Sequence, residues 1–205
     1  MNSFPLLKGI QASLEGVTDG QTRVEKEIVL YGKIQDFKEL EKADSKEDQE
    51  QWEIRHQSDG SPYAGCVRIR CIDGKTYILT TKTYKPDKGN LFETETELPP
   101  KVGKNIMEEF KKLSSGGMLK TRYVFKVPES ELLWEIDVYY DESGNPRTWC
   151  KVDLEVEDLR TKRPDLPITL KDVREIPAKN RSEDDQKFLD RLMTREFVTP
   201  NPYAE

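Results

Sequence analysis

The sequence has few of the residue types that build disulfide frameworks, zinc sites and catalytic triads. It contains three cysteines, Cys66, Cys71 and Cys150, without Cys-x-x-Cys spacing, and one histidine, His56, in a polar stretch. An odd number of dispersed cysteines argues against a disulfide framework and against a zinc site. One histidine gives little support to Ser-His-Asp catalysis and excludes a site with several histidine ligands. We expect His56 to be a solvated surface residue and the protein to be cytoplasmic.

The sequence also lacks a long apolar run and an excess of positive charge. No stretch approaches the roughly 20 apolar residues of a membrane-spanning helix, and residues 1–9 lack the apolar segment of a secretory signal. Lysine and arginine number 33 against 39 aspartates and glutamates, which gives a net charge of −6. We therefore expect no membrane partner and no broad binding to nucleic acid, although a local basic site is compatible with this balance.

From Val24 onward, short stretches of β-branched and aromatic residues that end at turn signals predict a β-rich domain. The predicted strands are Val24–Tyr31, Cys66–Ile72, Thr76–Tyr84, Phe92–Leu98, Thr121–Val127, Leu132–Tyr140 and Thr148–Glu157. The predicted helices are Asp36–Trp52, Gly103–Leu113 and Glu183–Phe197. We expect an appendage over residues 1–22, one domain over 23–197 and a flexible tail over 198–205.

Alternation within the predicted strands separates charged from apolar side chains, because residues i and i+2 of a strand share a face. In the last strand, Lys151, Asp153, Glu155 and Glu157 oppose Cys150, Val152, Leu154 and Val156. The other charged faces carry Glu25 and Glu27, Arg68 and Arg70, Lys82, Glu93 and Glu95, Lys120 with Arg122 and Lys126, and Glu135 with Asp137. An antiparallel sheet with one wet face would alternate in this way, but such a face normally mixes charges of both signs.

Rows of acid and base that are segregated by strand suit the inside of a barrel that binds a highly charged ligand. Basic rows would bind a polyanion, and acidic rows would hold hard divalent cations through oxygen ligands. A polyphosphate chelated to Mg²⁺ or Mn²⁺ meets both requirements. In the alternative interpretation the rows only form salt bridges with each other, which is a poor source of stability because desolvation can exceed the Coulomb gain.

Seven short segments in this order resemble one known family. They are Glu25-Lys26-Glu27, Arg68-Ile69-Arg70, Thr80-Thr81-Lys82, Glu93-Thr94-Glu95, Lys120-Thr121-Arg122, Trp134-Glu135-Ile136-Asp137 and Glu155-Val156-Glu157. Over roughly residues 24–195 the sequence resembles the CYTH superfamily, also called triphosphate tunnel metalloenzymes. The resemblance implies an α+β fold with an eight-stranded antiparallel β-barrel and flanking helices. The family has a lysine at the position of Val29, and by parity Lys126 and Lys151 are candidates for a compensating cation.

The resemblance further implies a metal-dependent triphosphatase that acts on inorganic triphosphate or on a nucleoside or organic triphosphate. The residues implied to bind phosphate are Arg68, Arg70, Lys82, Lys120 and Arg122. The ligands implied for Mg²⁺ or Mn²⁺ are Glu25, Glu27, Asp137, Glu155 and Glu157. Glu93 and Glu95, with Lys82, are the candidate catalytic residues, the glutamates as ligands or as groups that position the attacking water. A class IV type of adenylate cyclase and a catalytically weak module that binds nucleotide or polyphosphate are the alternatives.

Overall fold

A computed structural model describes residues 21–24, 27–57, 64–85, 90–114, 117–141, 143–156, 160, 162–176 and 182–193. The chain forms two compact units, of which the first comprises Met1–Val24 and Gln51–Ser115 and the second Glu25–Glu50 and Gly116–Glu205. Strand β3 (Ser45–Gln57) contributes to both units. Residues 1–20, Glu25, Glu157, the predicted tail 198–205 and the side chain of His56 lie outside the described part of the protein.

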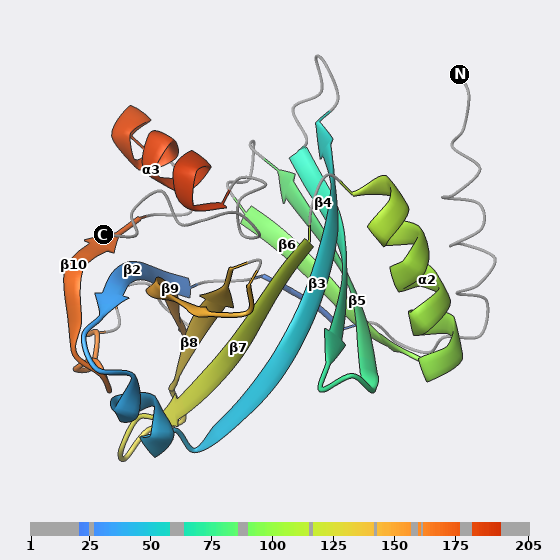
Figure 1. Ribbon diagram of the computed structural model, residues 1–205. Helices are drawn as coiled ribbons and strands as arrows, with labels where there is room; N and C mark the ends of the chain where they lie inside the picture. Colours follow the sequence, from blue (N-terminus) through green and yellow to red (C-terminus); the bar gives the residue numbers. More distant parts are fainter. Residues whose placement is uncertain are drawn as a thin grey trace. The chain divides into compact units, whose positions relative to one another are not determined.

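The first unit is an antiparallel sheet with one helix packed on it (Figure 1). Its strand order is β1 (Gln21–Val24), β6 (Asn90–Leu98), β5 (Thr76–Lys85), β4 (Ala64–Ile72) and the end of β3. Asp73 and Gly74 form the tight turn between β4 and β5 with φ angles of 50° and 70°. Helix α2 (Pro100–Leu113) buries Ile106, Met107 and Phe110 against the apolar face of the sheet. This confirms the helix that the sequence predicts over Gly103–Leu113 and the face that it buries.

The second unit continues from β3 through a longer antiparallel run. Its strand order is β3, β7 (Gly117–Lys126), β8 (Leu133–Tyr140), β9 (Pro146–Glu155), β2 (Glu27–Ile34) and β10 (Leu170–Glu175). One face of this sheet carries the largest apolar core, with Trp134, Ile136, Val152 and Leu154 at its centre. These are the residues that the alternation places opposite the charges, so the period of two holds in the folded protein.

Helix α3 (Glu183–Met193) packs on the other face of the second unit, at the end of the sheet where β2 and β9 pair. Phe188 lies edge-on to Tyr31 and to Trp149, with ring centroids 5.9 Å and 5.2 Å apart. Leu189 belongs to the same apolar cluster. Among the described residues, neither α2 nor α3 has the length and hydrophobicity of a segment that spans a bilayer.

The antiparallel α+β architecture is confirmed, but the predicted helix over Asp36–Trp52 is wrong. The structure has a 3₁₀ helix, η1 (Phe37–Lys42), capped by the Asp36 carboxylate at the Lys38 amide, followed by the thirteen-residue strand β3. The many Glu, Lys and Gln residues there favour a helix locally, but packing overrides this propensity. Trp52 and Ile54 pack against the core of the first unit, while Gln49 and Gln51 are buried on the opposite face of β3. With β1 and β10, which the sequence analysis also missed, the described strands number ten rather than eight.

Gly103 allows α2 to approach β5 closely, because a Cβ at this position would overlap Cβ and Cγ of Tyr77. In an open helix Gly→Ala stabilises by about 1 kcal/mol. Here we expect Gly103→Ala to destabilise the protein by about 1–3 kcal/mol, since the buried Tyr77 ring must shift. Urea denaturation measures the change, with Lys104→Ala at an exposed position of the same helix as the control. A Gly103→Ala variant as stable as the wild type would show that the helix does not depend on this close approach.

Candidate functional site

The charged faces of the two units each carry a cluster of ion-paired side chains. In the first unit the cluster lies on β4, β5 and β6, where the register places Arg68 opposite Thr80 and Thr80 opposite Glu95. We call it the basic cluster, because its charged members are three cations, Arg68, Arg70 and Lys82, and two carboxylates, Glu93 and Glu95. The alternation of the strands predicts these five residues on charged faces, and the structure places them in contact.

Within the basic cluster the two carboxylates share Arg68 and differ in their second cation. Arg68 Nη2 lies 3.3 Å from Glu93 Oε1 and 3.4 Å from Glu95 Oε1. Arg70 Nη2 donates to the same Glu95 oxygen at 3.1 Å, and Lys82 Nζ lies 3.0 Å from Glu93 Oε2. Glu93 is 2% exposed, whereas the side chain of Glu95 is 32% exposed. Glu93 therefore acts as a buried anchor for Arg68 and Lys82, and Glu95 presents its second oxygen to solvent.

The second unit carries a cluster on β2, β7, β8 and β9, which we call the acidic cluster. Its charged members are three cations, Lys120, Arg122 and Lys151, and five carboxylates, Glu27, Glu135, Asp137, Asp153 and Glu155. The register sets Arg122 opposite Asp137 and Asp137 opposite Lys151 across three neighbouring strands. Glu27 of β2 pairs in register with Glu155 of β9. Acid therefore exceeds base in this cluster, in contrast to the basic cluster.

Asp137 occupies the centre of the acidic cluster and is 1% exposed. Its Oδ2 accepts from Lys120 Nζ at 2.5 Å and from Arg122 Nη2 at 3.0 Å, and its Oδ1 accepts from Arg122 Nε at 2.8 Å. Arg122 also pairs with Glu135. Both oxygens of Asp137 are thus engaged by cations, so in this structure the carboxylate orients Lys120 and Arg122.

For Asp137 and for Lys120, burial and the oppositely charged partner shift the pKa in opposite directions. Burial alone would raise the pKa of Asp137, but Lys120 and Arg122 hold it well below its ordinary value. Burial lowers the pKa of Lys120 to about 7, against the attraction of Asp137 and with the help of Arg122. The two residues are coupled, because Lys120 and Arg122 both lower the pKa of Asp137, while Asp137 raises the pKa of Lys120.

Asp153 differs from Asp137 in having an oxygen without a partner. Lys151 Nζ donates to Asp153 Oδ2 at 2.7 Å, while Oδ1 is buried and has no hydrogen-bond partner within the part of the chain that the structure describes. Burial raises the pKa of Asp153 to about 6, Lys151 opposes the shift, and Glu27 and Asp137 add to it. A buried carboxylate oxygen without a donor is costly and suits a hard cation as its missing partner.

A divalent metal ion fits the donor chemistry of this cluster, although no group of three or more potential ligands converges among the described residues. The unpartnered oxygen of Asp153 and the register pair Glu27 and Glu155 supply carboxylate oxygens on neighbouring strands. Oxygen donors of this type suit Mg²⁺ or Mn²⁺. Of the three other predicted ligands, Glu25 and Glu157 lie outside the described residues, and Asp137 has both oxygens engaged by Lys120 and Arg122.

Val29 occupies the charged face of β2 but belongs to an apolar cluster. It is 8% exposed and packs with Tyr31, Trp149, Ile176 and the two buried residues of α3. The polar face of β2 and β9 is therefore divided into a charged part and a part that α3 covers. Of the two lysines predicted to compensate, Lys151 lies in the acidic cluster, whereas Lys126 is exposed at the end of β7.

A comparison of the sequence with protein families gives a match over most of these strands. A CYTH domain profile matches residues 36–172, which is more than half of the chain. The chain belongs to the CYTH domain family. The matched region runs from η1 into β10 and includes every described charged residue of the two clusters except Glu27, which lies on β2. No curated protein matches the chain.

Solved structures give weaker similarities to this CYTH domain. The PH1012 protein from Pyrococcus horikoshii OT3 is 20% identical, with a TM-score of 0.44 over 66% of this chain and 80% of that one. The inorganic triphosphatase NE1496 is 17% identical, with a TM-score of 0.41 over 78% and 91%. HpAC1 from Hippeastrum, described as having a dominant triphosphatase activity, is 16% identical, with a TM-score of 0.41 over 64% and 79%. TM-scores of 0.41–0.44 are too low to support a conclusion about the activity of this chain.

Three residues of the two clusters, Glu135, Asp153 and Thr80, are not among the predicted site residues. Glu135 and Asp153 share the charged faces of β8 and β9 by parity, and this signal could have identified them. Thr80 has no charge, and only the contacts described above show that it lies between Arg68 and Glu95. The buried Gln49 and Gln51 were hidden by the incorrect helix prediction.

The raised pKa of Asp153 predicts how the stability of the protein changes with pH after a chelator has removed any metal. Between about pH 4, the ordinary pKa of aspartate, and about pH 6, the folded state binds more protons at this site than the unfolded state. Asp153 therefore makes the protein less stable as the pH rises through this window. We expect the melting temperature of Asp153→Asn, relative to that of the wild type, to rise by several degrees from pH 4 to pH 7, equivalent to about 1–3 kcal/mol.

The loss of the contact with Lys151 adds an offset that is constant over this range, so the trend with pH is the quantity to compare. Asp165→Asn, which removes an exposed carboxylate, is the control. Parallel melting curves for wild type and Asp153→Asn would contradict the raised pKa.

Proposed function

We propose that this CYTH domain binds a triphosphate together with Mg²⁺ or Mn²⁺ and hydrolyses a phosphoanhydride bond. The observation that carries the proposal is the excess of carboxylates in the acidic cluster, including a buried Asp153 oxygen with no donor among the described residues. The cluster holds five carboxylates against the three cations Lys120, Arg122 and Lys151. A module that only bound anions would have no use for this excess.

In each cluster, taken by itself, the cations are the proposed phosphate ligands. Arginine offers a planar fork that matches phosphate oxygens, and lysine supplies a compact charge. Arg68 Nε is buried and makes no hydrogen bond to a described residue, so this guanidinium retains donor capacity beyond its contacts with Glu93 and Glu95. In the acidic cluster Lys120 and Arg122 are held by Asp137, which we propose acts as their anchor.

Glu27, Asp153 and Glu155, with the predicted ligands Glu25 and Glu157, are the residues proposed to hold the metal. When bound, a divalent ion neutralises charge on phosphate oxygens and lowers the pKa of a coordinated water molecule. The protein would then orient the phosphates and position the water. Within the basic cluster, Glu95 has an exposed oxygen that we propose for positioning water. This chemistry needs no histidine base and no nucleophilic side chain.

A catalytically weak binding module is the second candidate, and Val29 is the observation that favours it. An apolar contact with α3 stands where the family has a lysine, so one cation is missing from the charged face of β2.

The products formed from ATP would also reveal a cyclase, because cyclisation releases pyrophosphate whereas hydrolysis of the terminal bond releases phosphate.

Metal dependence gives the most direct test of the proposed function. We expect phosphate release from inorganic tripolyphosphate or from a nucleoside triphosphate with added Mn²⁺ or Mg²⁺, loss of this activity in EDTA, and its return when metal is added back. The assay measures phosphate over a panel of triphosphates. Binding of these compounds without any turnover would favour the binding module, and full activity in EDTA would contradict the metal assignment.

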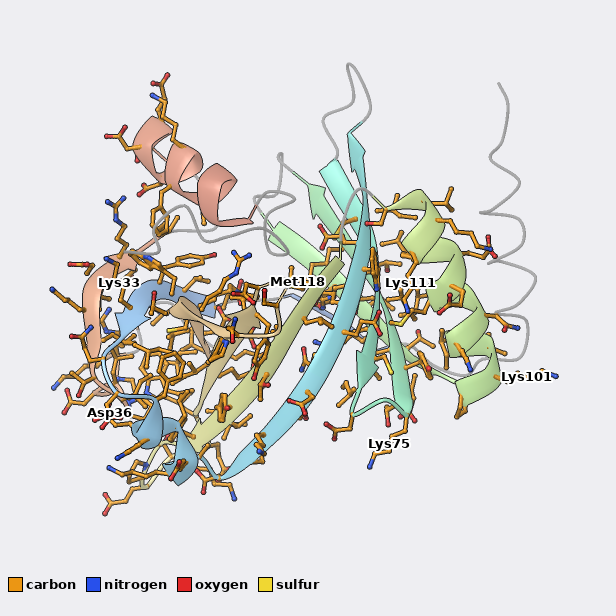
Figure 2. All side chains as sticks on the ribbon, in the orientation of Figure 1. Lys33, Asp36, Lys75, Lys101, Lys111 and Met118 are labelled. Carbon is orange, nitrogen blue, oxygen red and sulfur yellow. The ribbon has the colours of Figure 1, made fainter. Side chains whose placement is uncertain are left out.

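The basic cluster is tested by Arg70→Ala. Since Arg70 supplies a buried charge-assisted donor, we expect the affinity for tripolyphosphate to fall about 10-fold to 100-fold, corresponding to about 1.5–3 kcal/mol. Calorimetric titration measures binding, and a thermal melt shows whether the variant is folded. Lys75→Ala is the matched control, because Lys75 lies in the turn between β4 and β5 and points away from the sheet (Figure 2). Equal affinities in the two variants would remove the basic cluster from the binding site.

A further inference from the structure

Thr80 lies at the centre of the basic cluster and has no charge. It is 0% exposed, and the strand register places it directly between Arg68 on β4 and Glu95 on β6. Its Oγ1 donates to Glu95 Oε1 at 3.0 Å and accepts from Arg68 Nη2 at 3.3 Å. A hydroxyl has one proton to donate and lone pairs to accept, so Thr80 makes both kinds of contact at once.

The contacts converge on one oxygen of Glu95. Oε1 accepts from Thr80 and from both arginines, with Arg68 Nη2 at 3.4 Å and Arg70 Nη2 at 3.1 Å. The two guanidinium groups already neutralise the carboxylate, so the hydroxyl is not needed for charge balance. The hydroxyl instead fixes the orientation of the Glu95 carboxylate. A β-branched side chain in a strand has few χ1 rotamers, and this one is fully buried.

The other oxygen of Glu95, Oε2, has no partner in the described part of the chain, and the side chain is partly exposed. With Oε1 fixed from three sides, the carboxylate can present only Oε2 outward. The two nearest positions on this face of β5 are Ile78, whose side chain cannot donate, and Lys82, which is engaged by Glu93. Thr80 is therefore the neutral donor on β5 that reaches Glu95.

We propose that Thr80 is a positioning residue, which locks Glu95 Oε1 against the two arginines so that Oε2 is held ready to orient the attacking water at a phosphate bound by the basic cluster. The proposal rests on the proposed function. It assigns to Thr80 no contact with the substrate, and the effect of the residue is transmitted through Glu95 and Arg68.

The test compares three variants of the CYTH domain. Thr80→Val keeps the shape of the side chain and removes the hydroxyl, and Thr80→Ser keeps the hydroxyl. Thr81→Val makes the same change at an exposed position on the opposite face of β5. With inorganic tripolyphosphate or ATP and Mn²⁺, we expect Thr80→Val to lower kcat about 10-fold with KM changed less than about 2-fold, because the lost interaction orients a reacting group. Thr80→Ser is expected to restore kcat to within about 3-fold of wild type, and Thr81→Val to leave it unchanged.

Crystal structures of the wild type and of Thr80→Val provide a readout that needs no activity. The proposal expects Glu95 Oε1 to leave its position between the two arginines in Thr80→Val and to keep it in the wild type. A wild-type protein that hydrolyses no triphosphate would sink the proposed function, while a displaced Glu95 would still support the positioning role. An unmoved Glu95, a Thr80→Val variant with the kcat of the wild type, or equal losses in Thr80→Val and Thr80→Ser would each overturn the assignment of Thr80.

Discussion

The ion-paired group of Lys120, Asp137 and Arg122 is the interaction on which the acidic cluster depends. Asp137 is almost fully buried, and it remains charged only because two cations share its oxygens. Breaking a buried ion pair on one side leaves an uncompensated charge, which costs several kcal/mol. The three residues therefore have to be placed together, and the antiparallel register of β7 and β8 places them. Around this fixed centre Lys151 and Asp153 extend the charged surface onto β9.

The basic cluster is organised by a different principle. Its carboxylates are separated by burial, since Glu93 is enclosed between Arg68 and Lys82 while Glu95 reaches solvent. Each glutamate sits on β6 opposite a residue of β5, with Glu95 beside Thr80 and Glu93 beside Lys82. The same carboxylate chemistry thus yields an anchor at one position and an accessible oxygen two residues away. Local packing, and not residue type, separates the two roles.

Much of this arrangement follows from the sequence because the period of a strand is two. On β9 the alternation of Lys151, Asp153 and Glu155 with Val152 and Leu154 has one solution that buries the apolar residues, and the structure adopts it. The long strand β3 could not be predicted in this way. Its Glu, Lys and Gln residues have helical propensity, and only contacts with distant strands favour the extended form. The role of Thr80 was likewise invisible, because a threonine in a strand carries no pattern until its neighbours are known.

Helix α3 and strand β2 are coupled through Val29. The side chain of Val29 lies on the charged face of β2, yet it is enclosed by Phe188, Leu189 and Ile176. A lysine at this position would carry its stem past these apolar side chains toward Asp153, which the register places opposite residue 29 and whose Oδ1 has no donor among the described residues. The ammonium group would gain a partner there, but the apolar contact between Val29 and the docked helix would be lost. Charge at position 29 and the packing of α3 are therefore linked, and an engineer who wished to add a lysine there would have to redesign the helix contact as well.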